Sequence, residues 1–192
     1  DLHSFPTRRS SDLKISWIYI PHTKVDYPIA QSADDNSYYL KYNMNKEPEF
    51  AGCIYTENYN SKDFEDPNTV IYGHNMRNDS MFGSLHDFED SKFFEKNKFV
   101  FIYTPDKVMT YRIFAAYEYD DRHILGTFDF SGKEVYDKYL KSIYEVNTMV
   151  SNYRKDVKVT SEDKIITLST CASGKPESRY LVQAVLEDVK TR

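Results

Sequence analysis

The feature that most constrains the fold is a set of short runs in which apolar or aromatic residues alternate with other residues. This alternation is clear at residues 15–19 and 25–29 near the start of the chain, and at 179–186 near its end. Side chains two residues apart lie on the same face of a β-strand, so a period of two predicts strands. The sequence contains 17 Tyr and 12 Phe, and aromatic residues suit a pleated, half-buried surface. A mainly β fold is therefore expected.

Apolar runs bounded by polar or turn-forming residues predict the remaining strands. Shorter helical turns are expected where apolar residues recur at steps of three and four behind residues that can cap a helix. The further strands are predicted at residues 69–72, 98–103, 108–119 and 164–170, and the short helical turns at 32–40, 81–88 and 91–94.

One long helix is predicted over residues 132–147. Ser131 and Glu134 have the spacing of a capping box, in which two side chains satisfy main-chain donors at the start of a helix. Apolar residues then recur at steps of four and three from Val135 to Val146, which gives the helix one apolar face.

Length and charge limit the class of protein. A chain of 192 residues fits one domain, in which roughly 70% of the unfolded surface can be buried. Residues 1–13 are polar and without a period, so we expect a non-native or disordered leader there and one domain over 14–192. The net charge is −5 with both signs interleaved, which disfavours nucleic acid as a partner. No stretch approaches the roughly 18 apolar residues of a membrane-spanning helix, so we expect a soluble chain.

The two cysteines, Cys53 and Cys171, are too few for a disulfide scaffold or for a structural zinc site. One disulfide between them is possible on number alone. Cys53 lies in an apolar run without polar neighbours, which favours a place in the core. No histidine has a second ligand at metal-binding spacing, so neither a metal nor another cofactor is expected.

Three side chains near predicted strand ends are candidates for chemistry. Cys171 follows a strand directly and precedes a loop with Gly and Pro, which is typical of a nucleophile at a rim; the alternative is a small buried hydrophobic residue. His74 ends another strand, where an imidazole can exchange protons near neutral pH; the alternative is a structural histidine. Arg179 begins the strand after the Cys171 loop, so an antiparallel return would bring its fixed charge beside the thiol. The alternative is a surface arginine.

Two segments together resemble the signatures of the sortase family. Residues 167–171 read TLSTC and are followed by Arg179, while residues 72–76 read YGHNM. The order His, Cys, Arg is also the order of that family. Residues 35–40, DNSYYL, and the long helix before the last two strands resemble class B in particular. The resemblance covers roughly residues 15–189.

This resemblance implies a closed, mostly antiparallel, eight-stranded β-barrel with peripheral helices and a site at one rim. The alternation itself would fit a sandwich equally well. The implied activity is that of a cysteine transpeptidase, which cleaves a C-terminal sorting signal after Thr and transfers the surface protein through a Cys thioester. Cys171 would be the nucleophile, His74 its proton partner and Arg179 the cation that stabilises the transition state.

The implied partners are the sorting-signal peptide of a surface protein and an amine of peptidoglycan or lipid II. By position in the class motif, the groove for the peptide would be lined by Asn36, Leu40, Tyr72, Ser169 and Thr170, with barrel packing as the alternative role for Leu40 and Tyr72. The implied location is the extracellular face of the membrane of a Gram-positive bacterium. Attachment there would depend on an N-terminal anchor, which residues 1–13 do not resemble.

Two other functions remain open at this stage. A cysteine hydrolase would use the same nucleophile but release the acyl group to water. A non-catalytic β-barrel adhesion module would leave Cys171 inert. An added amine separates the first from a transpeptidase, and the reactivity of the thiol separates the second.

Overall fold

The protein, described here by a computed structural model over residues 16–192, is built around one β-sheet. The predicted leader at residues 1–13 lies outside the described residues. The strands are β1 (Ser16–Tyr19), β2 (Asp26–Gln31), β3 (Ile54–Thr56), β4 (Asn68–Tyr72), β5 (Phe99–Tyr103), β6 (Lys107–Asp120), β7 (Asn152–Tyr153), β8 (Ile165–Ala172) and β9 (Lys175–Thr191).

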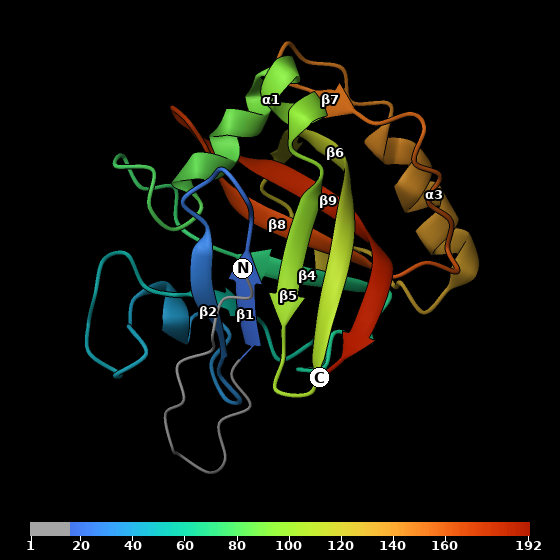
Figure 1. Cartoon of the computed structure of the whole chain (residues 1–192). Coiled ribbons are helices and arrows are strands. Elements are labelled where there is room, and N and C mark those ends of the chain that lie inside the picture. The colour runs from blue at the N-terminus through green and yellow to red at the C-terminus, as the bar shows by residue number, and fades with distance from the viewer. Residues whose placement is uncertain (1–15) are drawn as a thin grey trace.

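The sheet closes on itself. Its strand order is β5-β1-β2-β3-β4-β8-β9-β6-β7, and β5 also pairs with β6 (Figure 1). Eight strands therefore form a barrel, and β7 extends the sheet beside β6. The mainly β fold and the closed eight-stranded barrel implied by the resemblance are confirmed, and a sandwich is excluded because no edge separates two sheets.

Most neighbouring strands are antiparallel, but β2 with β3 and β4 with β8 pair in parallel. Parallel neighbours need a long crossover connection. Between β4 and β8 that crossover contains four of the five helices of the described residues as well as β5, β6 and β7. As a result, the C-terminal ends of β4 and β8 lie at the same edge.

The helices are short and peripheral. They are η1 (Tyr38–Leu40), η2 (Gly83–Glu89), α1 (Ser91–Lys96), α2 (Ile124–Thr127) and α3 (Lys133–Ile143), where η marks a 3₁₀ helix. The helical turns predicted at 81–88 and 91–94 correspond to η2 and α1. At the start of α1, the Asp90 carboxylate accepts the Phe93 N–H at 2.8 Å, as a capping residue does. None of the helices in the described part of the chain is long and apolar enough to cross a membrane.

The helix expected over residues 132–147 is present, but α3 begins at Lys133 and ends at Ile143. The expected capping box does not form at its start. The residue before the helix is Gly132, with no side-chain cap, and the Ser131 hydroxyl instead donates to Asp129 at 2.6 Å.

At the other end of α3, the chain tightens and leaves the helix. The N–H groups of Tyr144 and Glu145 reach back three residues, to the carbonyls of Lys141 and Ser142, which is the bonding of a tightened last turn. The apolar period that continued to residue 146 therefore does not extend the helix.

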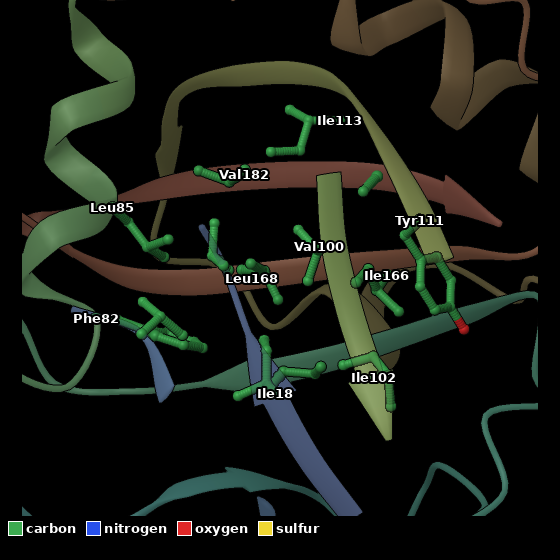
Figure 2. Close-up of a cluster of buried hydrophobic side chains, with 14 of the residues drawn as sticks. Ile18, Phe82, Leu85, Val100, Ile102, Tyr111, Ile113, Ile166, Leu168 and Val182 are labelled. Carbon is green, nitrogen blue, oxygen red and sulfur yellow. The ribbon is translucent and has the colours of Figure 1, made fainter. Parts of the chain in front are cut away.

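The barrel interior is apolar. Even-numbered residues of β8, Ile166 and Leu168, point into it, and each is fully buried. Burying an aliphatic side chain of this size contributes about 1.5–3 kcal/mol, so this interior is the main source of stability. Figure 2 shows the cluster, which includes Ile18, Phe82, Leu85, Val100, Ile102, Ile113 and Val182.

The outer face of the same strands is covered by α3, which lies on the outside of the barrel (Figure 1). This second cluster is rich in rings and contains buried hydrogen bonds. Gln183 donates to the Tyr139 hydroxyl and to the Thr167 hydroxyl, both at 2.8 Å, and accepts from the Tyr117 hydroxyl at 2.8 Å. Since both N–H groups and the oxygen of the Gln183 amide are used, the network fixes the position of α3 on the sheet.

Candidate active site

The three candidate side chains lie in one row across three neighbouring strands. In the parallel pairing of β4 with β8, Tyr72 is opposite Ser169. Counting two residues further along each chain sets His74, just beyond the end of β4, at the level of Cys171 in β8. On the other side of β8, Cys171 pairs directly with Arg179 of β9. Because neighbouring strands are about 4.8 Å apart, the register brings these side chains together.

This row lies on the outer face of the barrel wall. Ile166 and Leu168 point inward, and Cys171 is an odd number of residues from both, so its side chain points outward. Cys171, His74 and Arg179 all line one pocket of about 330 Å³. The Cys171 side chain is exposed, so it is not the small buried hydrophobic residue of the alternative interpretation.

The turn after Cys171 breaks the regular ladder. Cys171 pairs with Arg179, but Ala172 pairs with Lys175, so the register shifts between the two residues of β8. The turn then passes through Gly174, whose φ of +71° favours glycine. Bulges of this kind redirect side chains beside functional sites, which explains how a strand residue presents its thiol at a rim.

His74 is held by its main chain and by its ring. Gly73, just before it, has no room for a side chain, because an added Cβ would lie 2.5 Å from Ile54. The ring nitrogen Nε2 donates to the Leu40 carbonyl at 2.8 Å. A carbonyl only accepts, so Nε2 carries a hydrogen and Nδ1 remains for proton exchange. Phe50 stacks on the His74 ring with a centroid distance of 5.8 Å.

Arg179 is half-buried and lines the pocket. Its Nη1 donates to the carbonyls of Pro176 and Ser178, at 3.0 and 3.1 Å. The guanidinium is thus held beside the pocket by its own loop. Its positive charge acts on the rings of Tyr55 and Tyr72 in the pocket wall.

Tyr55 and Tyr72 stack on each other at 5.4 Å and form a wall of the pocket. Burial raises the pKa of Tyr55 to about 12, and the nearby Glu57 carboxylate adds to the effect. Burial likewise raises the pKa of Tyr72, with a further contribution from Glu57. Both hydroxyls are therefore neutral at physiological pH. Arg179 is the fixed positive charge of this wall.

The predicted groove residues do not all lie at the pocket. Leu40, Tyr72, Ser169 and Thr170 line it, whereas Asn36 is outside its lining. The Asn36 amide oxygen accepts the main-chain N–H of Asn58 at 2.7 Å. A groove role for these residues stays a prediction.

Thr170 is a special case among them. It is 2% exposed and lies two residues after Leu168, on the strand face that points into the barrel. Within residues 16–192, its hydroxyl has no hydrogen-bond partner. Any contact of Thr170 with a bound peptide would therefore involve its main chain rather than its hydroxyl.

The opposite wall of the pocket was not predicted. It is formed by residues 119–124, between the end of β6 and α2, and includes His123. His123 Nε2 donates to Glu57 at 2.6 Å, while its Nδ1 accepts the Gly126 N–H at 2.8 Å. This segment has no sequence motif of its own, and only the tertiary fold brings it to the site.

The second cysteine is in the core, as predicted. Cys53 is 5% exposed, and its thiol lies 3.4 Å from the Tyr42 carbonyl. Both cysteines are free, so the disulfide that their number allowed does not form.

Comparisons with known proteins agree with this geometry. A family model described as the sortase domain matches residues 18–187. Among characterised proteins, sortase B of Listeria monocytogenes is 36% identical over 175 residues, which is 90% of this chain and 69% of that protein. Sortase B of Staphylococcus aureus is 27% identical over 176 residues, or 92% of this chain and 70% of that protein.

The fold matches solved structures as well. The X-ray structure of Clostridium perfringens sortase B superposes with a TM-score of 0.81 at 36% identity, covering 91% of this chain and 94% of that one. The family match over residues 18–187 includes β4, β8 and the part of β9 that carries Arg179.

Proposed function

Because this chain belongs to the sortase family, and within it to class B, we propose that Cys171, His74 and Arg179 carry out its cysteine transpeptidase reaction. The observation that supports these roles is the register of β4, β8 and β9, which sets the three side chains in one row at one pocket. The hydrolase and the adhesion module left open by the sequence are not favoured, since the relatives are sortases.

In the first half of the reaction, the Cys171 thiolate attacks the carbonyl carbon of a Thr in the sorting signal. The carbonyl oxygen becomes an oxyanion, which the Arg179 guanidinium stabilises. The C–N bond then breaks, and the imidazolium of His74 protonates the leaving amine. The product is a thioester between the Thr carbonyl and Cys171.

In the second half, an amine of the cell wall attacks the thioester. His74 Nδ1 accepts the proton of the attacking amine, since Nε2 is engaged with the Leu40 carbonyl. The C–S bond breaks, the new amide leaves and the thiolate of Cys171 is restored. The single proton that His74 takes up in this step replaces the one that it gave to the leaving amine in the first half.

For the partners, we propose the C-terminal sorting signal of a surface protein and the amine of peptidoglycan or lipid II. The stacked rings of Tyr55 and Tyr72, whose hydroxyls are neutral at physiological pH, provide a wall that suits a peptide ligand. We place the reaction at the outer face of the membrane of a Gram-positive bacterium, in agreement with the source of the relatives. Residues 14–192 are proposed to form a single catalytic domain.

The test is a transfer assay. The protein is incubated with peptides that contain Thr-Gly or Thr-Asn, with and without an amine such as triglycine or a diamino-acid stem peptide. We expect an amide product in preference to the acid, and a thioester on Cys171 in the mass spectrum. Formation of the acid alone at saturating amine would favour the hydrolase, and an unmodified Cys171 with every peptide would contradict the proposed nucleophile.

A further inference from the structure

The main-chain carbonyl of Cys171 is contacted by two side chains from outside the row of candidate residues. The Asn75 amide nitrogen donates to this oxygen at 3.0 Å, and His86 Nε2 lies 3.0 Å from the same oxygen. Asn75 also donates to the Ser173 hydroxyl at 3.3 Å. Two polar side chains therefore converge on the peptide group of the proposed nucleophile.

These contacts occur where the sheet alone does not fix the chain. The pairing of β8 with β9 shifts register directly after Cys171, so the ladder does not determine the path beyond that residue. Asn75 follows His74 in the sequence, at the end of the neighbouring strand. Its amide therefore ties the strand end that carries the proton partner to the one that carries the thiol.

The His86 ring is itself fixed on two sides. Its Nδ1 lies 2.5 Å from a Glu89 carboxylate oxygen, and the ring stacks on Tyr180 at a centroid distance of 5.0 Å. The His86 side chain is only 15% exposed. Ring position and ring orientation are thus both determined, so Nε2 is aimed at the Cys171 carbonyl.

The contacts of His86 Nε2 cannot all be donor–acceptor pairs in one protonation state, because it lies near both the Cys171 carbonyl oxygen, which accepts, and the Asn75 amide nitrogen, which donates. A carboxylate and a carbonyl only accept, so a His86 ring that serves Glu89 and Cys171 carries a hydrogen on both nitrogens. The two N–H groups of Asn75 then go to Cys171 and Ser173. In the neutral ring with its hydrogen on Nδ1, Nε2 would instead accept from Asn75 at 3.1 Å, and the carbonyl would lose a donor.

We propose that Asn75, His86 and Glu89 form a positioning unit that holds the main chain of Cys171 and thereby directs its thiol at the substrate carbonyl. None of the three is proposed to touch the substrate, so their effect is on the rate of attack and not on peptide binding. Small displacements matter here, since a shift of about 1 Å in an attacking group can cost about 100-fold in rate. The inference rests on the proposed function, in which Cys171 is the nucleophile.

The first test uses two substitutions of His86. His86→Phe keeps a ring to stack on Tyr180 but removes both N–H groups, whereas His86→Gln keeps one donor. We expect kcat of the transfer reaction to fall about tenfold in His86→Phe, the usual effect of one lost hydrogen bond, with KM unchanged. His86→Gln should recover most of the loss. His22→Gln, at an exposed turn residue, is the matched control and should match the wild type.

The second test covers Asn75 and measures the thiol directly. Asn75→Ala, with the exposed Asn147→Ala as its control, should lower kcat and also slow the alkylation of Cys171 by iodoacetamide about tenfold. The double variant Asn75→Ala/His86→Phe should lose less than the product of the single losses, because both residues act on one carbonyl. Glu89→Gln, which keeps the shape, should give a smaller loss of about threefold.

The outcomes separate the inference from the proposed function. If kcat and the alkylation rate of His86→Phe and Asn75→Ala equal those of the wild type, or if the loss is confined to KM, the positioning unit is refuted. If the wild type transfers no peptide but Cys171 alkylation still slows in both variants, the proposed function fails and the unit stands. If either variant is unfolded by circular dichroism, Glu89→Gln decides by the same two rates: a loss of about threefold supports the unit, and wild-type rates refute it.

Discussion

The two free cysteines occupy regions with opposite physical character. Cys171 lies at an interrupted strand end, exposed, level with His74 and paired with Arg179. Cys53 is 5% exposed, and burial raises the pKa of its thiol to about 11. One residue type therefore supports chemistry in one place and packing in the other.

The difference lies in the surroundings and not in the thiol itself. Cys53 packs with Ala30 and Tyr55 in a small apolar cluster, and its thiol is hydrogen-bonded to the neutral Tyr42 carbonyl. An apolar cluster disfavours the thiolate, because an anion there loses its hydration. Cys171 has a guanidinium across the ladder and an imidazole on the next strand, which is the setting of a reactive thiol.

The largest expected effect is on transfer activity, and it depends on which cysteine is replaced. Cys171→Ala should abolish transfer, because no thioester can form, whereas Cys53→Ala should keep kcat within about twofold of the wild type. The assay is peptide transfer to triglycine, followed by liquid chromatography. Transfer by Cys171→Ala at the wild-type rate would remove the distinction between the two regions.

The next largest effect is expected on kcat when the positive charge of Arg179, which pairs with Cys171, is removed. Arg179→Gln should lower kcat about 100- to 1,000-fold, as the removal of one oxyanion donor does. Arg179→Lys should recover only part of the rate, since an ammonium does not reproduce the planar guanidinium. The control is Arg77→Gln at an exposed position. A normal rate in Arg179→Gln would mean that another group stabilises the oxyanion.

A third prediction compares the two thiols in one sample. At pH 7, the buried Cys53 thiol with pKa about 11 is thiolate in only about one molecule in 10,000, and its burial also keeps the reagent away, whereas the Cys171 side chain is exposed. Iodoacetamide should therefore label Cys171 at least 100-fold faster than Cys53, as read by peptide mass spectrometry. Equal labelling of the folded protein would show that the apolar cluster around Cys53 opens readily.

The smallest expected effect is on stability. Cys53→Ala should lower the free energy of unfolding by about 1 kcal/mol at pH 7. The Cys53 thiol has a folded-state pKa of about 11, above the value of about 8.5 in the unfolded chain. Its stabilising effect is thus complete below pH 8.5 and is lost as the pH rises towards 11. Urea unfolding at several pH values measures this difference.

In that experiment, the stability gap of about 1 kcal/mol between wild type and Cys53→Ala should close within about one pH unit above 8.5 and then reverse, because each pH unit between the two pKa values costs the folded wild type about 1.4 kcal/mol. Most other groups titrate identically in the two proteins, so subtracting the two curves isolates Cys53. A gap that widens with pH would mean that the folded state favours the thiolate, which contradicts burial as the dominant cause.

Local sequence patterns predicted the elements better than their arrangement. Strands β5, β6 and β8 were found within a residue or two, because alternation is a local signal. The parallel pairing of β4 with β8 was not predicted, because it joins Tyr72 to Ser169 across a long crossover. The end of α3 was also missed, because the apolar period continues past the last helical residue, Ile143.

The candidate site was predictable only where a motif marks it. His74, Cys171 and Arg179 stand in recognisable segments, and the structure brings them to one pocket. His86 appeared only within the helical turn predicted at 81–88, and the 119–124 wall only through the end of the strand predicted at 108–119. Their contacts depend on tertiary packing, which leaves no trace in the spacing of residues.

The parallel pairing of β4 with β8 makes the site tolerant of breaks in the connecting chain. His74 and Cys171 are held by neighbouring strands, while residues 144–151 of the connecting segment lie outside the helices and strands, between α3 and β7. Met149 in that segment has its full surface accessible to solvent. A protease that cleaves the chain at this point would leave two fragments that stay associated through the pairing of β4 with β8. His74 and Cys171 would then remain at the same pocket.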